Sequence, residues 1–304
     1  MGFLNRGGPK ESRDERERRE ARREADVQRI AAGGIPAAAE ERLRTLGAEA
    51  GQAFTSDLSV PEFALARRHR LEPLTQVMGS SVYHVGWQYL NQGLWGSTIQ
   101  ELSVLADAYN DCRARAFARL RQEAELAGAD AVVGVRITAA RYDWGSDLVE
   151  FQAIGTAVRA PELGAGAGPA LTNLSGQDVS LLLDGGYVPL GVVGATSVFY
   201  GQLWTWGQSM PFGQGGGFWS VGNVEFQGAT RTWYTARHAV LERLRADAAA
   251  LGAAGIIGTD WGQEERPYEQ NERVSGVTYT IHALATAIVG SGRVLPTPTT
   301  TIPL

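Results

Sequence analysis

The chain has 304 residues, a hydrophobic content of 44% and a formal net charge of −5. This length suffices for two cores of domain size, and the acidic balance argues against the concentrated basic face that nucleic-acid binding needs. The single cysteine, Cys112, excludes an intrachain disulfide and favours a reducing compartment. With no signal-peptide core and no long apolar run, we expect a cytoplasmic protein without a transmembrane segment.

Residues 1–58 are expected to form a charged, helical and partly disordered N-terminal extension. Glu11–Glu24 holds six acidic residues and six arginines, with no apolar stripe beside them. Acidic residues lie four positions before arginines, an order that supports a solvated helix. Gly33–Pro36 ends this helix, and Ala37–Leu46 predicts a second, short one. A solubilising role is favoured over an interaction role for this extension.

A long stretch of the chain then occurs twice. Ala118–Gly134 returns as Glu242–Gly258 at an offset of 124 residues, and self-similarity at a long period indicates a repeated structural unit. The predicted division is a first unit at 59–160, a Gly/Ala/Pro linker at 161–174, a second unit at 175–290 and a disordered tail at 291–304.

Each unit is expected to begin with a short helix and a strand. Ser59–Glu62 and Ser175–Asp178 have the pattern of a capping box, which starts a helix. The strands Leu71–Gly79 and Tyr187–Gly194 follow at an offset of 116. A further strand of β-branched and aromatic residues is predicted at Ser81–Tyr89 and is echoed from Ser197 onward.

A long amphipathic helix comes next in both copies, with apolar or small residues at spacings of three and four. In the first copy this face consists of Leu102, Leu105, Tyr109, Cys112, Ala116, Leu120, Ala124 and Ala127, and in the second of Phe226, Ala229, Trp233, Ala236, Val240, Leu244, Ala248 and Leu251. Gly128 and Gly252 follow the last turn, where a residue in the left-handed conformation commonly ends a helix.

Two more strands complete each unit. Ala131–Ile137 and Gly255–Trp261 come first, and Val149–Arg159 and Tyr279–Val289 follow at an offset of 130. The growing offset places about eight extra residues before the second long helix and six more around Glu264–Ser275. Because insertions belong in loops, both places are predicted to be loops.

The motif around Arg113–Arg136 with Gly155–Val158 resembles the YbjQ-like proteins, a family also named for heavy-metal binding. The second copy resembles it through Arg237–Asp260 with Ala285–Ile288, although Thr259 and Asp260 replace Val135 and Arg136, and Ala285 replaces Gly155. The resemblance implies an α+β fold in which each tandem unit packs one long helix on an antiparallel sheet. It also implies self-association through the sheet edges into a ring, typically of five units around an axis.

Tandem copies conflict with an odd-numbered ring. Chains that each place two units in one ring cannot close a ring of five. If the family geometry holds, the copies are expected to segregate into two stacked rings built by five chains; otherwise the ring size differs.

Metal, cofactor and catalytic motifs are weak. A metal site needs converging thiolates or imidazoles, and the chain offers Cys112 and four histidines, none of them repeated between the copies. His84 and His282 remain weak metal candidates, since assembly could gather one histidine per chain around an axis. The glycine runs at 164–168 and 213–217 lack the context of a phosphate loop. We therefore expect no resident cofactor and no catalytic residues.

Two uncharged aromatic segments are the candidate contact sites, one in each copy. A hairpin core would explain them, and assembly contact, ligand stacking or shallow membrane anchoring are the alternatives. We favour assembly contact for these residues, which are Trp87 and Trp95 in the first copy and Trp204, Trp206, Phe212, Phe218 and Trp219 in the second.

The sequence thus predicts a cytosolic, non-enzymatic protein that forms a ring-like homo-oligomeric assembly or scaffold. The alternative is a binding module for a heavy metal ion or a small aromatic ligand at subunit interfaces. Convergence of polar residues such as His84 or His282 would distinguish the two.

Overall fold

The computed structural model describes residues 13–48, 53–85, 99–142, 148–163, 168–202, 225, 227–270 and 273–290. The N-terminal extension contains α1 (Arg13–Ala31) and α2 (Ala37–Ala48). The first half of the protein, residues 53–163, contains α3 (Val60–Arg68), β1 (Glu72–His84), β2 (Ile99–Glu101), α4 (Ser103–Leu126), β3 (Ala131–Tyr142) and β4 (Leu148–Arg159). The second half, residues 168–290, contains β5 (Ala170–Leu171), α5 (Gly176–Asp184), β6 (Tyr187–Gln202), α6 (Gln227–Ala250), β7 (Gly255–Gln270) and β8 (Arg273–Gly290).

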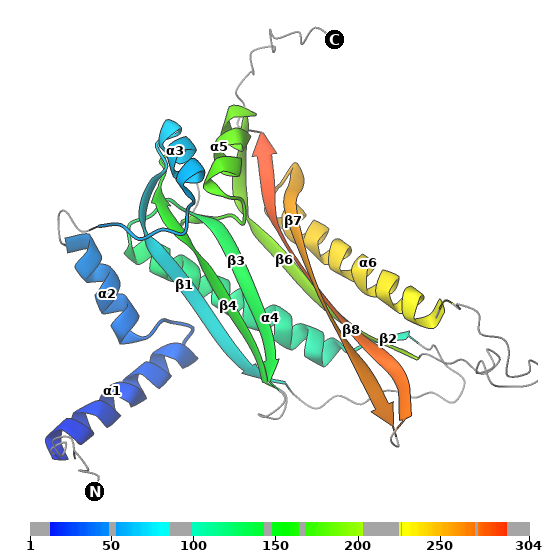
Figure 1. Cartoon of the computed structure of the whole chain (residues 1–304). Coiled ribbons are helices and arrows are strands. Elements are labelled where there is room, and N and C mark those ends of the chain that lie inside the picture. The colour runs from blue at the N-terminus through cyan, green and yellow to red at the C-terminus, as the bar shows by residue number, and fades with distance from the viewer. Residues whose placement is uncertain are drawn as a thin grey trace, which may run out of the picture.

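The described strands form two sheets of four strands that stand side by side (Figure 1). The first sheet has the order β1-β4-β3-β5 and the second β2-β6-β8-β7. All neighbouring strands are antiparallel except β3 and β5, which are parallel. The predicted α+β class is confirmed. Each sheet also receives one short strand from the other half of the chain, since β2 pairs with β6 and β5 pairs with β3.

Each sheet packs one face against a long helix. The apolar stripe of α4 is buried from Leu105 to Ala124 against β1 and β4, and that of α6 from Ala236 to Ala248 against β6 and β8. The predicted helix faces are therefore confirmed along most of their length. Leu251 is an exception, because it lies beyond the end of α6 and is 46% exposed. Phe226 lies outside the described residues.

Unusual backbone positions recur in the two halves at the predicted offsets. The register between β1 and β4 shifts after Pro73, and that between β6 and β8 shifts after Pro189. A second shift accompanies glycines of positive φ, Gly134 at 64° and Gly258 at 61°. The helix-ending glycines Gly128 and Gly252 also have positive φ, as predicted.

Two predicted boundaries are wrong. The region Glu264–Ser275 was expected to be a loop, but strands β7 and β8 continue through its described residues as a longer hairpin. Arg266 Nε donates to Glu264 Oε1 at 2.7 Å, two residues away on the same face of β7. The separate strands expected at Leu71–Gly79 and Ser81–Tyr89 are one strand, β1, because Gly79 continues the extended backbone against α4.

The two helices of the N-terminal extension differ in how they are held. No residue of α1 is buried, which agrees with the predicted solvated helix. In contrast, α2 packs on α4: Leu43 is fully buried, and Arg42 Nη2 lies 3.1 Å from Glu123 Oε2. Arg119 of α4 also donates to the carbonyl of Ile30, in the last turn of α1, and to that of Gly34, between the two helices.

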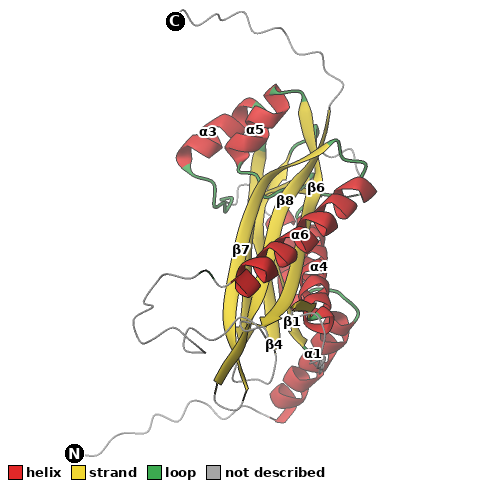
Figure 2. Cartoon of the chain, turned by 90° about the vertical axis from the view of Figure 1, so that its right-hand side faces the viewer, coloured by secondary structure: helices red, strands yellow, loops and turns green. Residues whose placement is uncertain are grey.

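The two short helices α3 and α5 lie together at one end of the strands (Figure 2). Their starts follow the predicted caps: Ser59 N–H donates to Glu62 Oε2, and Ser175 Oγ accepts from the Asp178 N–H. His69 Nε2, after α3, lies 3.2 Å from Asp184 Oδ1 at the end of α5. None of the described helices is long and apolar enough to span a membrane.

The close approach of β1 to α4 gives a first testable prediction. A Cβ atom on Gly79 would lie 2.0 Å from the Ala116 carbonyl oxygen, which is backbone and cannot rotate away. Gly79→Ala is therefore expected to lower the free energy of unfolding by about 1–3 kcal/mol, as overpacking does, measured by urea denaturation. Gly255→Ala is the control, because its Cβ would meet nothing closer than 3.9 Å; equal losses for both variants would contradict the prediction.

Candidate functional site

The contact between the two halves centres on β6, which is covered on both faces. Its residues Val193, Ala195 and Phe199 pack in the cluster beneath α6. The alternate residues point to the other side, where Val198 joins the core cluster around α4 of the first half. All residues from Val193 to Phe199 are buried.

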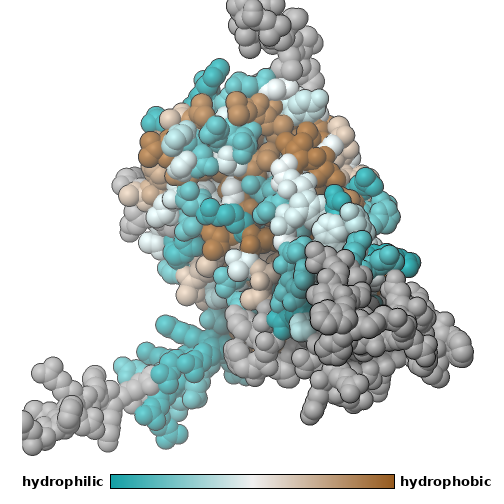
Figure 3. Space-filling model, turned by 45° about the vertical axis from the view of Figure 1, so that its right-hand side comes forward, coloured by the Kyte–Doolittle hydropathy of each residue, from teal (hydrophilic) through white to brown (hydrophobic). Residues whose placement is uncertain are grey.

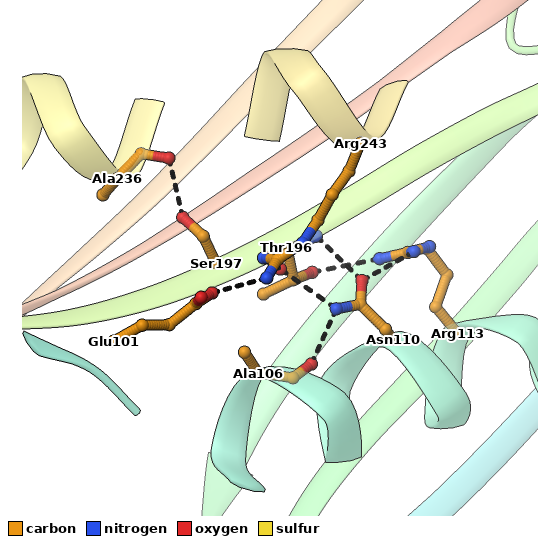
Figure 4. A network of polar contacts seen from close by, with 8 residues as sticks. All are labelled: Glu101, Ala106, Asn110, Arg113, Thr196, Ser197, Ala236 and Arg243. Atoms are coloured by element: carbon orange, nitrogen blue, oxygen red, sulfur yellow. Dashed lines mark hydrogen bonds and ion pairs between the residues drawn. The ribbon is translucent and has the colours of Figure 1, made fainter. Parts of the chain in front are cut away.

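Arg113 of α4 carries the principal polar contact across this boundary (Figure 4). Its Nη2 donates to the Gly194 carbonyl at 2.5 Å, and its Nη1 donates to Thr196 Oγ1 at 3.1 Å. A third bond, from Nη2 to Asn110 Oδ1 at 2.8 Å, holds the guanidinium against its own helix. The side chain is thereby buried while its guanidinium donates to three acceptors: one carbonyl, one hydroxyl and one side-chain amide oxygen.

Thr196 is the centre of the network. Its N–H donates to Asn110 Oδ1 at 2.9 Å, while its carbonyl accepts from Asn110 Nδ2 at 3.0 Å. The same carbonyl accepts from Arg243 Nη1 of α6 at 2.9 Å, and Arg243 Nη2 donates to Glu101 Oε1 of β2 at 2.6 Å. Both long helices and β2 are therefore joined through one residue of β6.

Burial lowers the pKa of Arg113 to about 10; within that net value the Asp247 carboxylate raises the pKa and the nearby Arg243 lowers it. The guanidinium remains charged at neutral pH. Burial raises the pKa of Asp247, and the charge of Arg113 counteracts that rise. A buried cation of this kind is tolerated only where hydrogen bonds and an opposite charge compensate its loss of water.

His282 of β8 lies in the same boundary. Its ring is edge-on to Tyr109 and Phe151 of the first half, with centroids 5.2 and 5.9 Å away. Nδ1 lies 2.9 Å from Thr196 Oγ1, the oxygen that also accepts from Arg113 Nη1. Burial, and then the charge of Arg113, lowers the pKa of His282 to about 4. The imidazole is therefore neutral at physiological pH.

A second contact joins the halves at the outer strand of the first sheet. The segment 170–174 of the second half adds to β3, with the Thr172 N–H donating to the Val132 carbonyl at 2.9 Å. Thr172 Oγ1 lies 2.8 Å from Thr286 Oγ1 of β8, and both threonines are fully buried. Part of the predicted linker thus forms a strand.

A groove of about 360 Å³ lies between β3 and the strands β7 and β8. It is lined by Ile137 and Ala139 on one side and by residues 260–264 and 282–284 on the other. Trp261, 40% exposed, stands in its wall with the Arg237 guanidinium 5.8 Å above the ring. Figure 3 shows hydrophobic residues gathered in groups over the upper half of one face of the molecule.

The predicted metal candidates lie in different sheets. His84 pairs with Leu148 at the end of β1, whereas His282 occupies the boundary just described. Within the described residues, no group of three or more His, Cys, Asp or Glu side chains could hold a metal ion. Cys112 is buried on α4, as expected, with Sγ 3.0 Å from the Ser81 carbonyl, and burial raises its pKa.

The predicted aromatic contact residues cannot be placed. All seven, namely Trp87, Trp95, Trp204, Trp206, Phe212, Phe218 and Trp219, lie outside the described residues. Their role in assembly stays a prediction.

The residues that carry the boundary were not singled out in the sequence. Arg113 and Asn110 look like solvent-facing positions of an amphipathic helix, since polar residues are expected there. The available signal was in β6, where Thr196 and Ser197 interrupt an otherwise apolar strand. A polar pair inside a strand buried on both faces requires partners.

Comparisons with known proteins agree with this architecture. The sequence model of the YbjQ family, described as "Putative heavy-metal-binding", matches residues 74–161. The chain is also 34% identical over 272 residues to the encapsulin nanocompartment protein Rv1762c of Mycobacterium tuberculosis, an alignment that covers 88% of this chain and 96% of the relative. The chain belongs to the YbjQ-like family. No solved structure matches it.

The matched region of this YbjQ-like protein runs from β1 to the end of β4 and includes Arg113. The alignment with the mycobacterial relative extends much further along the chain. It follows that the likeness is to a protein of similar length, and not to a single unit alone.

Loss of Arg113 is predicted to weaken the boundary. In Arg113→Met, the Gly194 carbonyl and Thr196 lose a buried donor and Asp247 loses its nearby cation, so the free energy of unfolding should fall by about 2–4 kcal/mol. Urea denaturation measures this. Arg231→Met on the exposed side of α6 is the matched control and should cost less than about 0.5 kcal/mol; a similar loss in both variants would refute a special role for Arg113.

Acid is predicted to destabilise the protein through His282. Because its folded pKa of about 4 lies below the usual 6.5, the neutral ring favours folding above pH 6.5, and this contribution is lost as the pH falls toward 4. The loss attributable to this group is roughly 3 kcal/mol. His282→Gln, which places the residue found at position 152, should flatten the fall in stability between pH 6.5 and 4.5, followed by urea titrations at each pH. The exposed His238→Gln is the control; if His282→Gln shows the unaltered pH slope, the prediction is wrong.

Proposed function

We propose that this YbjQ-like protein is a non-enzymatic, self-assembling structural subunit of a cytosolic protein compartment or ring. The observation that carries the proposal is the boundary between its halves, where α4 of one half packs on the sheet of the other. The name of the mycobacterial relative, an encapsulin nanocompartment protein, supports assembly as the role. The buried free thiol of Cys112 supports a reducing location.

We further infer that the two halves are copies of one unit, since their internal contacts correspond. Arg119 donates to the Ser80 carbonyl in the first half, and Arg243 donates to the Thr196 carbonyl in the second. Ser80 lies within β1 and Thr196 within β6, 116 residues apart, as the sequence repeat requires. The domain limits 59–160 and 175–290 are part of this proposal.

The boundary between the copies is heterologous, because the two contribute different surfaces to it. The first half offers α4 and the edge of β3, and the second offers β6 and segment 170–174. Heterologous contacts generate rings where the rotation closes. Neighbouring copies in one chain favour a ring with an even number of units, while two stacked rings of five units are the arrangement expected from the family.

The groove beside Trp261 supports the second candidate, a binding module for a small aromatic ligand. Its lining includes Trp261, Asp260 and Glu264, and the Arg237 guanidinium lies over the Trp261 ring. Stacking on the indole would supply the affinity. A heavy metal has less support, because the described residues hold no cluster of ligands.

Native mass spectrometry at micromolar concentration tests the proposal. The expected result is a defined homo-oligomer, with a mass that is a multiple of the 32.6 kDa chain and that distinguishes an even-membered ring from two stacked five-membered rings. A monomer would refute assembly. Metal analysis of the untagged protein is the companion measurement: stoichiometric zinc or copper would favour the binding module.

A further inference from the structure

The outer position of the first sheet, beside β3, is occupied by a segment from the second half of the chain. Four backbone bonds hold segment 170–174 to β3: Ala170 N–H to the Asp130 carbonyl, Thr172 N–H to Val132, and the N–H groups of Val135 and Gly134 to the carbonyls of Thr172 and Leu174. Their lengths are between 2.8 and 3.1 Å. Ala131, Val132 and Val133 of β3, beside this added segment, are fully buried.

The corresponding edge of the second sheet is open. At the offset of 124 residues, the groups that receive segment 170–174 correspond to those of Ala254, Ile256, Gly258 and Thr259. Strand β7 is the outer strand of its sheet: β8 pairs with one edge of it, and no described strand pairs with its other edge. Residues 258–262 are exposed, whereas Val135 at the corresponding place in β3 is buried.

The chain also carries an unused copy of the segment that would fill this edge. Residues 54–58 correspond to 170–174 at the offset of 116, and their inward contacts agree. The Asp57 N–H donates to Thr156 Oγ1 at 3.3 Å, as the Asn173 N–H donates to Thr286 Oγ1 at 3.2 Å. The Leu58 N–H donates to Ser56 Oγ, as the Leu174 N–H donates to Thr172 Oγ1.

The outer side of this segment is uncovered. Phe54 is 49% exposed and Thr55 is exposed, while at the corresponding positions Ala170 is half-buried and Leu171 is fully buried. The outer face of β1 is uncovered as well: Val82 is 56% exposed, whereas Val198, at the corresponding place on β6, is fully buried under α4. The first half therefore leaves exposed the same surface that, in the second half, is covered by contact with the first half.

We propose that β7 (254–259) of one chain receives segment 54–58 of a second copy as an added parallel strand. The register follows from the intrachain pairs: since Ala131 pairs with Ala170, Gly255 pairs with Phe54 of the second copy, and Ile256 with its Thr55. The same superposition lays α6 over the outer face of β1 of the second copy. The inference rests on the proposed self-assembly and names the contact that produces it.

Two physical arguments favour a second copy as the occupant. An open strand edge with free N–H and C=O groups pairs with any suitable strand, and proteins protect such edges. Here the matching segment is already held in place: the Asp57 N–H donates to Thr156 Oγ1, and Thr55 Oγ1 accepts from the Gln76 N–H and lies 3.1 Å from Thr75 Oγ1. Its ordering cost has therefore largely been met before it binds. Because donor and acceptor surfaces lie at opposite ends of the chain, each added copy presents a new open edge, which leads to a closed ring or a filament.

Site-specific disulfide formation tests the proposal in the full chain. A size-tagged chain with Phe54→Cys is co-expressed with an untagged chain carrying Gly255→Cys, both with Cys112→Ala, the residue found at position 236. A Cβ at Gly255 meets no atom within 3.8 Å, so the backbone accepts the change. Mild oxidation is expected to yield the mixed dimer at least about tenfold above either homodimer on a non-reducing denaturing gel.

Two further variants calibrate the result. Ala131→Cys with Ala170→Cys in one chain reports whether this register can form a disulfide, and His238→Cys, exposed on α6, replaces Gly255→Cys as the negative control. Mixed dimer no more abundant than with His238→Cys, or a predominance of homodimers, would overturn the proposal. Native mass spectrometry of the same samples separates the causes: an oligomer without the mixed disulfide refutes this contact alone, whereas a monomer refutes self-assembly too.

Discussion

A buried guanidinium holds the two halves of this protein in one arrangement. Arg113 leaves water on entering the boundary, and its hydrogen bonds are restored only when the Gly194 carbonyl and Thr196 stand at the right distance. Apolar packing alone would allow the sheets to slide, because dispersion and hydrophobic burial have little directional preference. Two fixed acceptors on β6 remove that freedom. The orientation of α4 on the second sheet, the place of His282 and the addition of segment 170–174 to β3 all depend on it.

Much of the fold was predictable because its signals are local. The stripe along α4 and α6 follows the helical period, and Gly128 and Gly252 mark positive φ just after the last turn. The prediction of a loop at Glu264–Ser275 is wrong, because strands β7 and β8 continue through its described residues. An insertion divided between two antiparallel strands lengthens a hairpin instead of widening a loop, and an offset between copies cannot distinguish the two outcomes.

The site was less predictable, because it exists only where two elements distant in sequence meet. Asn110 and Arg113 have the spacing of a solvent-facing helix side, and nothing local shows that β6 covers them. His282 is not repeated in the first half, where Gln152 stands at the corresponding place, and the sequence therefore makes it only a weak site candidate. Yet a boundary between two copies buries different faces of each, so residues at the boundary need not repeat. Lack of repetition was thus no argument against a role in packing.

The two halves also differ at individual pairs of contacting residues, and these differences compensate each other. In the first half, Asp57 receives a bond from Arg136 and a second from Thr156 Oγ1. In the second half, Asp260 stands where Arg136 would be, so a carboxylate at 173 would face another carboxylate without a cation. The residue there is Asn173, whose Nδ2 donates to the Gly258 carbonyl at 2.6 Å and whose Oδ1 still accepts from Thr286. An amide can donate where a carboxylate cannot, so the exchanges at 57/173 and 136/260 compensate each other. The two halves therefore differ in charge while retaining the threonine-anchored segment, and in the second half that segment joins it to β3 of the first.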